Sequence, residues 1–73
     1  MDKVEEIFEE LIVRQKHRLM RYAREKIPYI TEEDLLQPND FPLLELDPFF
    51  RYEEGVLEGV LSSKAAYLSN KAL

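Results

Sequence analysis

The residues with the clearest capacity for chemistry are the basic side chains between positions 14 and 24. They recur at intervals of three or four positions, so they share one face if the segment is helical. The members of this basic stripe are Arg14, His17, Arg18, Arg21 and Arg24. Such a face could bind phosphate groups or an acidic protein partner. It could equally be a solvated surface with local ion pairs, for which Glu10–Arg14 and Arg21–Glu25 have the right spacing.

A second candidate is the acidic and aromatic block over residues 40–55, DFPLLELDPFFRYEEG. Paired carboxylates can serve acid–base chemistry or bind a divalent cation. Here Asp47 is better explained as a helix N-cap, and Glu53 and Glu54 follow near the start of that helix. The chain has no cysteine, and His17 has no second histidine with which to chelate a metal. We therefore expect no catalytic site, metal or cofactor, and we do not expect an enzyme.

Composition limits the remaining classes of protein. The chain has 73 residues, of which 45% are hydrophobic, so it is too apolar for a disordered protein and forms one domain, residues 1–73. A chain this short has a marginal core, and without disulfides or a metal a partner subunit is the remaining source of stability. No stretch approaches the roughly 20 apolar residues of a membrane span. The acidic start does not resemble a secretory signal, so we expect a cytoplasmic protein without membrane contact.

Residues 2–26 have the pattern of one long helix. Asp2 can cap its start, acidic residues follow in the first turn, and Pro28 disfavours helix at Ile27. At about 100° per residue, the apolar residues form one broad face opposite the basic stripe. They are Val4, Phe8, Leu11, Ile12, Leu19, Tyr22 and Ala23, widened by Val13, Met20 and Ile27. So wide an apolar face predicts more than one packing neighbour.

Residues 27–47 form the expected connector. Thr31 begins a capping pattern that predicts a short helical turn over residues 32–37, which Pro38 ends. Pro42 is expected to keep the following segment extended or irregular. The connector is nevertheless rich in leucine and contains Phe41, so we expect it to be ordered and to pack on the helices.

Residues 48–71 predict the second long helix, with Asp47 as N-cap and Pro48 at its first position. Its apolar residues form two seams about 100° apart, with Glu53, Lys64 and Lys71 between them. One seam contains Phe49, Val56, Val60 and Tyr67, and the other contains Phe50, Leu57, Leu61 and Leu68. Two seams indicate two packing partners, as in a helical bundle.

The second helix also carries a face of small residues, Gly55, Gly59, Ser62, Ser63 and Ala66. Each glycine inside a helix costs about 1 kcal/mol relative to alanine. We expect Gly55, Gly59, Ser63 and Ala66 to allow close approach by another helix or by the connector. The alternative is a helix in which tertiary contacts simply tolerate two glycines.

Charge is distributed in blocks along the chain, and the blocks predict how the helices meet. Residues 1–13 and 27–58 are acidic, whereas residues 14–26 and 59–73 are basic. Antiparallel helices place unlike blocks side by side, and parallel helices would place like blocks together. Each exposed ion pair contributes only about 0–1 kcal/mol, so the pattern decides orientation more than stability.

These observations predict an all-α fold, an antiparallel two-helix hairpin with an ordered connector that dimerises into a four-helix bundle. The expected function is protein–protein interaction as an adaptor module, with a homodimer or an acidic protein as partner. The alternative is a regulator that binds nucleic acid through the basic stripe. A net charge of −5 and the absence of a glycine-rich loop argue against that alternative.

Overall fold

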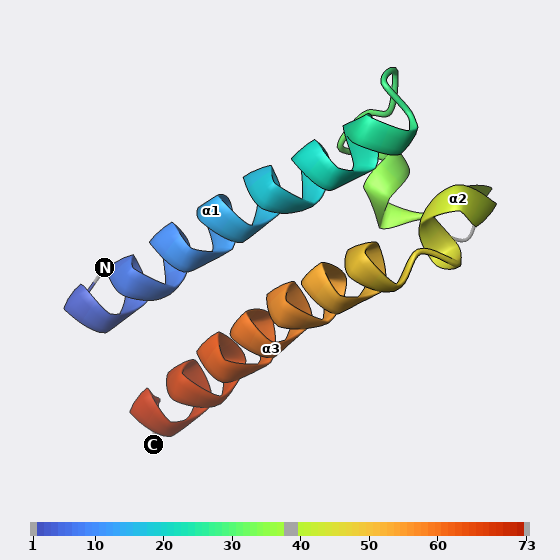
Figure 1. Ribbon diagram of the computed structural model, residues 1–73. Helices are drawn as coiled ribbons and strands as arrows, with labels where there is room; N and C mark the ends of the chain where they lie inside the picture. The colour runs from blue at the N-terminus through green and yellow to red at the C-terminus, as the bar shows by residue number, and fades with distance from the viewer. Residues whose placement is uncertain (1, 38–39, 73) are drawn as a thin grey trace.

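The computed structural model describes residues 2–37 and 40–72, and the helices found there form an antiparallel hairpin. The chain runs through α1 (Lys3–Lys26), a 3₁₀ turn η1 (Asp34–Leu36), α2 (Pro42–Glu45) and α3 (Pro48–Lys71). Figure 1 shows α1 and α3 side by side, with the connector at one end and both termini at the other. The all-α hairpin is thus confirmed, and its elongated shape measures 42 × 19 × 17 Å.

The expected signals at both ends of α1 are present. Asp2 Oδ1 accepts a hydrogen bond from the Glu5 backbone N–H at 2.8 Å, which satisfies a donor that has no partner within the helix. At the other end, Ile27 leaves helical geometry at φ −135°, while its N–H still donates to the Ala23 carbonyl at 2.8 Å. Pro28 follows directly and disfavours helix at the residue before it.

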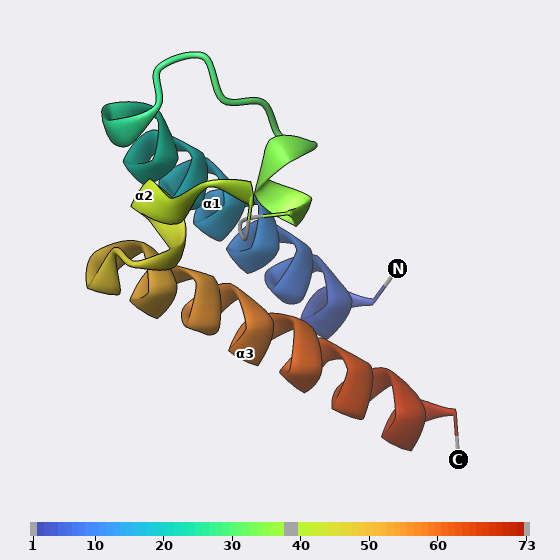
Figure 2. The same cartoon turned by 90° about the vertical axis from the view of Figure 1, so that its right-hand side faces the viewer.

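The connector is ordered, but it does not follow the sequence prediction throughout. Thr31 and Asp34 cap each other: the Thr31 N–H donates to Asp34 Oδ2 at 3.0 Å, and the Asp34 N–H donates to Thr31 Oγ1 at 3.3 Å. The resulting turn covers only Asp34–Leu36, shorter than the predicted range of 32–37. Pro38, expected to end it, lies outside the described residues. Figure 2 shows the connector running out beside α1 and returning through α2 to the start of α3.

The prediction that Pro42 keeps its segment extended is wrong. Pro42 is the first residue of α2, which runs to Glu45. A proline fits this position because its fixed φ suits a helix and because the first N–H of a helix needs no partner within the helix. The short helix turns the chain toward Asp47, whose Oδ1 accepts hydrogen bonds from the N–H groups of Phe49 and Phe50 at 2.9 and 3.1 Å and so caps α3.

The core lies at the connector end of the hairpin. Its buried cluster joins the end of α1 to the connector and the start of α3, through Leu19, Ala23, Ile27, Ile30, Leu44 and Phe50. Leu35, Phe41 and Leu57 pack against it while partly exposed. The prediction of a packed connector is confirmed in part, since Ile30 and Leu44 are fully buried, whereas Leu36, Leu43 and Leu46 are 78%, 62% and 81% exposed. Burying a side chain such as Phe50 contributes about 1.5–3 kcal/mol.

The other half of the hairpin is packed much less fully. Within the apolar face predicted for residues 2–26, Ile12 is buried, but Val4 and Leu11 are 40% and 39% exposed. Phe8 contacts Tyr67 across the helices, with ring centroids 6.0 Å apart. A two-helix layer can cover only one side of each helix, so the wide apolar faces remain partly exposed.

Candidate functional site

Ion pairs between α1 and α3 run along most of the hairpin and confirm the antiparallel charge match. Lys71 pairs with Asp2 and Glu5 at the open end, the end of the hairpin that holds both termini, and Lys64 pairs with Glu9. Arg18 pairs with Glu53 nearer the connector, at 3.2 Å. These pairs define the register, because each joins a residue of one acidic block to a basic residue of the neighbouring helix.

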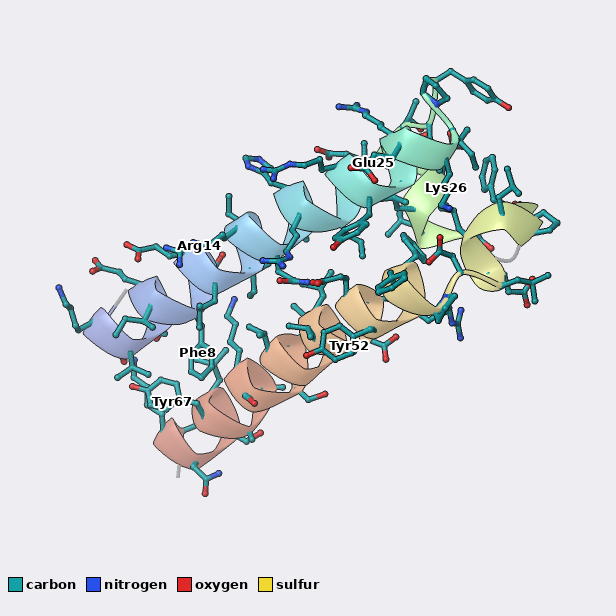
Figure 3. The ribbon with its side chains drawn as sticks, in the orientation of Figure 1. Phe8, Arg14, Glu25, Lys26, Tyr52 and Tyr67 are labelled. Atoms are coloured by element: carbon teal, nitrogen blue, oxygen red, sulfur yellow. The ribbon has the colours of Figure 1, made fainter. Side chains whose placement is uncertain are left out.

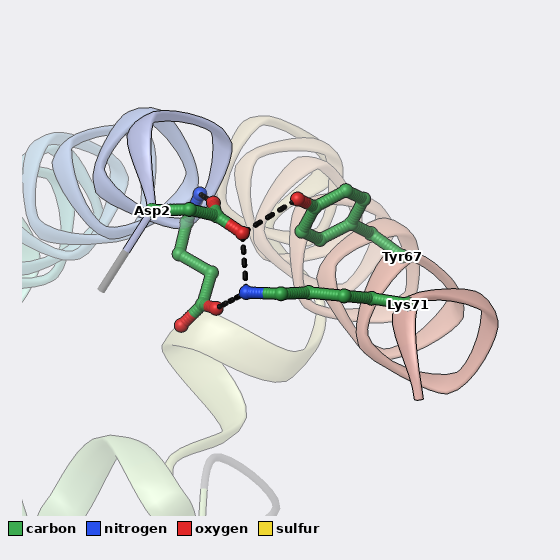
Figure 4. Close-up of polar contacts among 4 residues, drawn as sticks. Asp2, Tyr67 and Lys71 are labelled. Atoms are coloured by element: carbon green, nitrogen blue, oxygen red, sulfur yellow. Dashed lines mark hydrogen bonds and ion pairs between the residues drawn. The ribbon is translucent and has the colours of Figure 1, made fainter. Parts of the chain in front are cut away.

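The pair at the open end is part of a four-residue network that joins the two ends of the chain (Figure 4). Asp2 Oδ2 accepts hydrogen bonds from Lys71 Nζ and, at 2.7 Å, from the Tyr67 hydroxyl. The hydrogen bonds from Lys71, the Glu5 N–H and Tyr67 hold the pKa of Asp2 well below its usual value. Asp2 and Glu5 raise the pKa of Lys71, and the hydrogen bond to Asp2 raises the pKa of Tyr67. The network therefore stabilises charged Asp2 and Lys71 together.

Glu53 is a buried carboxylate, with only 7% of its surface exposed, and it faces α1. Gln15 Nε2 donates to Glu53 Oε2 at 2.6 Å and to the Glu53 carbonyl at 3.0 Å. Arg18 Nε donates to Glu53 Oε1 at 3.2 Å. These bonds satisfy a charge that would otherwise be costly to bury. Helical spacing alone predicts that Glu53 lies between the two apolar seams, and a charged residue flanked by such seams is the signal of a buried acceptor. Gln15 is not predictable as its partner, because it lies 38 positions earlier in the chain.

The basic stripe remains on the surface, but its members differ in their contacts. Arg14, His17, Arg21 and Arg24 are exposed, and Figure 3 shows Arg14 pointing away from α3. Arg18 is also exposed, but its side chain turns toward Glu53 and forms an ion pair that joins α1 to α3. Arg24 Nε lies 3.5 Å from the Ile30 carbonyl. Within residues 2–37 and 40–72, neither Glu10–Arg14 nor Arg21–Glu25 forms an ion pair.

The connector adds an acidic residue beside the basic stripe. An open cleft of about 590 Å³ is lined by His17, Met20, Arg21, Arg24, Glu25 and Glu32. Glu25 comes from α1 itself, whereas Glu32 comes from the connector. Two carboxylates thus lie with two guanidinium groups, which weakens the positive potential available to a phosphate ligand at this end.

The small-residue face of α3 is open to solvent. Gly55, Gly59, Ser63 and Ala66 are all exposed, and apart from the chain neighbours and the surrounding helix backbone no atom lies within 4 Å of a Cβ built on either glycine. Ser63 Oγ donates to the Gly59 carbonyl at 2.8 Å within the helix. The expected close approach by the connector or by α1 is therefore not found within the chain. Approach by another molecule stays a prediction.

Exposed apolar residues lie on two sides of the hairpin, and the connector marks one of them. Lys16, Met20 and Leu57 line one cavity of about 320 Å³ together with Leu35 and Leu36 of η1. We call this side the connector face. Beyond the cavity, the exposed apolar residues of this face are Val13, Leu61 and Leu68, which are 51%, 43% and 37% exposed.

The Arg18–Glu53 bridge marks the opposite side, because Arg18 lies about 160° around α1 from Met20. At about 100° per residue, Val4, Ile7 and Leu11 of α1 lie within about 40° of Arg18. On α3, Val56 and Val60 lie within about 60° of Glu53, on the side of Glu53 away from Leu57, Leu61 and Leu68. We call this set the open face: Val4, Ile7, Leu11, Val56 and Val60. Val4, Ile7, Leu11 and Val56 are 36–48% exposed, and Val60 is half-buried.

The register makes the open face continuous. Glu9 pairs with Lys64, so Leu11 lies level with the turn of α3 that holds Val60. The band starts on α3 at Val56, passes Val60, crosses to Leu11 and continues along α1 to Val4. A continuous apolar band on both helices is a surface that another helix could cover.

Residues 2–37 and 40–72 contain no group of three His, Cys, Asp or Glu side chains arranged to hold a metal ion. In the same residues, no helix has the length and apolar character needed to cross a membrane. Known protein families, curated protein sequences and solved structures give no match to this chain, so the candidate surfaces are identified from its own geometry.

Proposed function

We propose that this chain is a protein–protein interaction module, and that one of its partners is a second copy with which it forms a four-helix bundle. The observation that carries this proposal is the uneven packing of the hairpin. The connector closes the core at one end, whereas large apolar side chains remain exposed on both faces toward the other end. Exposed apolar surface that is continuous over two helices is typical of interaction sites.

The connector face suits a second copy because it carries both signs of charge. Lys16 lies on this face of α1, and Glu58 lies on the corresponding side of α3, about 140° from Glu53. A two-fold axis parallel to the helices would place each α1 over the partner's α3 at the same level. Lys16 would then lie near the partner's Glu58, and the acid–base match within the chain would be repeated between chains.

Light scattering tests the dimer directly. The unmodified chain should give about twice its mass of 8.7 kDa. Val13→Glu combined with Leu61→Glu should give a monomer, because charge would replace the apolar centre of the connector face. Leu46→Glu, at a position 81% exposed near the connector end, should remain dimeric as the control. A monomer at high concentration for the unmodified chain would contradict the dimer.

The basic stripe supports a second candidate function, binding to nucleic acid. The supporting observation is that Arg14 and Arg21 are exposed and form no ion pair within residues 2–37 and 40–72. Because Arg18 is bound to Glu53, the informative variant is Arg14→Glu with Arg21→Glu. It should abolish a salt-sensitive association with DNA or RNA, and no association by the unmodified chain would exclude this function.

A further inference from the structure

We propose that the open face binds one acidic amphipathic helix of another protein; this inference rests on the interaction role proposed above. The site consists of the apolar band of the open face, the basic edge that α1 adds to it, and the small residues that α3 adds to it. Each part has its own structural basis.

The apolar band is a surface on which one helix could pack. It runs from Val56 and Val60 on α3 across to Leu11, Ile7 and Val4 on α1. The band is therefore oblique to both helix axes. A single helix with an apolar stripe can follow such a band, as in helix-in-groove recognition.

The α3 side of the band allows a close approach. Ser63 lies within about 20° of Val56 around the helix, and Gly59 within about 60°. Both are exposed, and apart from the chain neighbours and the surrounding helix backbone no atom lies within 4 Å of a Cβ built on Gly59. A partner helix could thus approach closely at Gly59 and Ser63, and Tyr52, which is 70% exposed one turn before Val56, is the large side chain that it would meet on this flank.

The α1 side of the band is basic, and this decides the chemistry of the partner. Lys3, Arg14 and Arg21 lie within about 60° of Arg18, and all four side chains are exposed. Glu25 is the acid on the same flank, near the connector, and Glu10 lies further round the helix. Arg18 is already paired with Glu53. The remaining charge of this edge is positive, so carboxylates on the partner helix would be favoured there.

A second copy fits this face less well than an acidic helix. The flank of α3 that carries Val56, Val60, Gly59 and Ser63 contributes no charged side chain. If two α1 helices met here in antiparallel order, the arginines near the middle of each would face one another. If α1 met the partner's α3, the basic edge would face neutral residues. Only an acidic partner gives the basic edge an opposite charge.

The test uses two designed peptides of about 20 residues, which span about 30 Å as helices. Both carry leucine at intervals of three and four; one carries glutamate at the flanking positions and the other lysine. Fluorescence anisotropy of labelled peptide should show at least about tenfold tighter binding of the glutamate peptide. That preference should shrink in about 1 M salt, where the Debye length falls to about 3 Å.

Variants locate the binding. Leu11→Glu on α1 and Val56→Glu on α3 should each weaken binding of the glutamate peptide at least about tenfold. Leu46→Glu, at the exposed position near the connector end, should leave it unchanged. Arg14→Glu with Arg21→Glu should reverse the preference between the peptides. Equal affinity for the two peptides, or binding by neither, would overturn the proposal.

The outcome for the acidic helix is separate from the outcome for the dimer. A monomeric chain that prefers the glutamate peptide would support this inference and contradict the dimer. A dimer that Leu11→Glu dissociates, and Val13→Glu does not, would place a second copy on the open face and overturn the inference.

Discussion

Arg18 of α1 and Glu53 of α3 lie 3.2 Å apart, from Nε to Oε1, and join the basic half of one helix to the acidic start of the other. The two side chains differ sharply in environment, since the Arg18 side chain is 58% exposed and that of Glu53 only 9%. Glu53 also accepts two hydrogen bonds from Gln15, one at its side chain and one at its carbonyl. The bridge is therefore a buried acceptor site on α3 that two residues of α1 satisfy.

The first prediction concerns this asymmetry. Glu53→Ala should lower the free energy of unfolding by about 1–3 kcal/mol, because Gln15 would lose its acceptor in a partly buried place. Arg18→Ala should cost less than about 1 kcal/mol, since its guanidinium is largely solvated. Urea denaturation followed by circular dichroism measures both, with Arg14→Ala as the neutral control. An equal cost for Arg18→Ala and Glu53→Ala would show that the bridge is the dominant interaction and Gln15 is not.

The second prediction concerns pH at the open end. The pKa of Asp2 is lowered from its ordinary value of 3.8. Its ionised carboxylate therefore stabilises the folded chain at any pH above 3.8, including neutral pH. This stabilisation should fade as the pH falls below that value toward the lower pKa of the folded state. Asp2→Asn keeps a residue able to cap α1 but loses the ion pair with Lys71.

Thermal melts of the unmodified chain and of Asp2→Asn should therefore differ at pH 7 and converge under acid. Lys71→Gln should show the same loss at pH 7, because Lys71 is the principal partner of Asp2. Glu6→Gln, an exposed acid outside the network, serves as the control. A difference in melting temperature that persists unchanged at pH 2 would rule out the carboxylate as its source.

The third prediction compares two adjacent phenylalanines. Phe50 is 1% exposed within the core cluster, whereas Phe49 is 71% exposed. Phe50→Ala should cost about 3–5 kcal/mol because it leaves a cavity in the core. Phe49→Ala should stay within about 0.5 kcal/mol in the isolated chain. Chemical denaturation gives both values, and similar costs would mean that the core is not centred on Phe50.

The fourth prediction concerns Gly59. The position has open space around its Cβ, so Gly59→Ala should stabilise α3 by about 0.5–1 kcal/mol through helix propensity alone. Gly59→Leu should leave the isolated chain folded but weaken binding at the open face, where it would obstruct a partner helix. Destabilisation of the isolated chain by Gly59→Ala would show that something already packs on this face.

Local and periodic features of the chain could be predicted from its sequence. Helix ends follow from single residues that satisfy nearby backbone donors, as Asp2 and Asp47 do, so they depend on little beyond their neighbours. The antiparallel orientation follows from blocks of charge, since only one orientation places unlike blocks together. These two features were enough to establish the hairpin.

Features that depend on distant contacts could not be predicted in this way. Pro42 suits either an extended segment or the start of a helix, and the connector path decides in favour of α2. The burial of Glu53 depends on Gln15, 38 residues earlier in the chain. The approach of Glu32 to the basic stripe depends on how the connector folds back. Each of these features depends on a residue or segment far away in the sequence, and only the tertiary structure shows which residue or segment that is.

The same distinction between local features and distant contacts applies to the candidate sites. The sequence by itself determined that Arg14, His17, Arg18, Arg21 and Arg24 share one helical face, because that follows from helical periodicity. Only the tertiary structure decided that Arg18 turns toward Glu53 and that α1 and α3 together present an open apolar face. A surface made from two helices depends on their register, and register results from side chains that meet across the fold rather than along the chain.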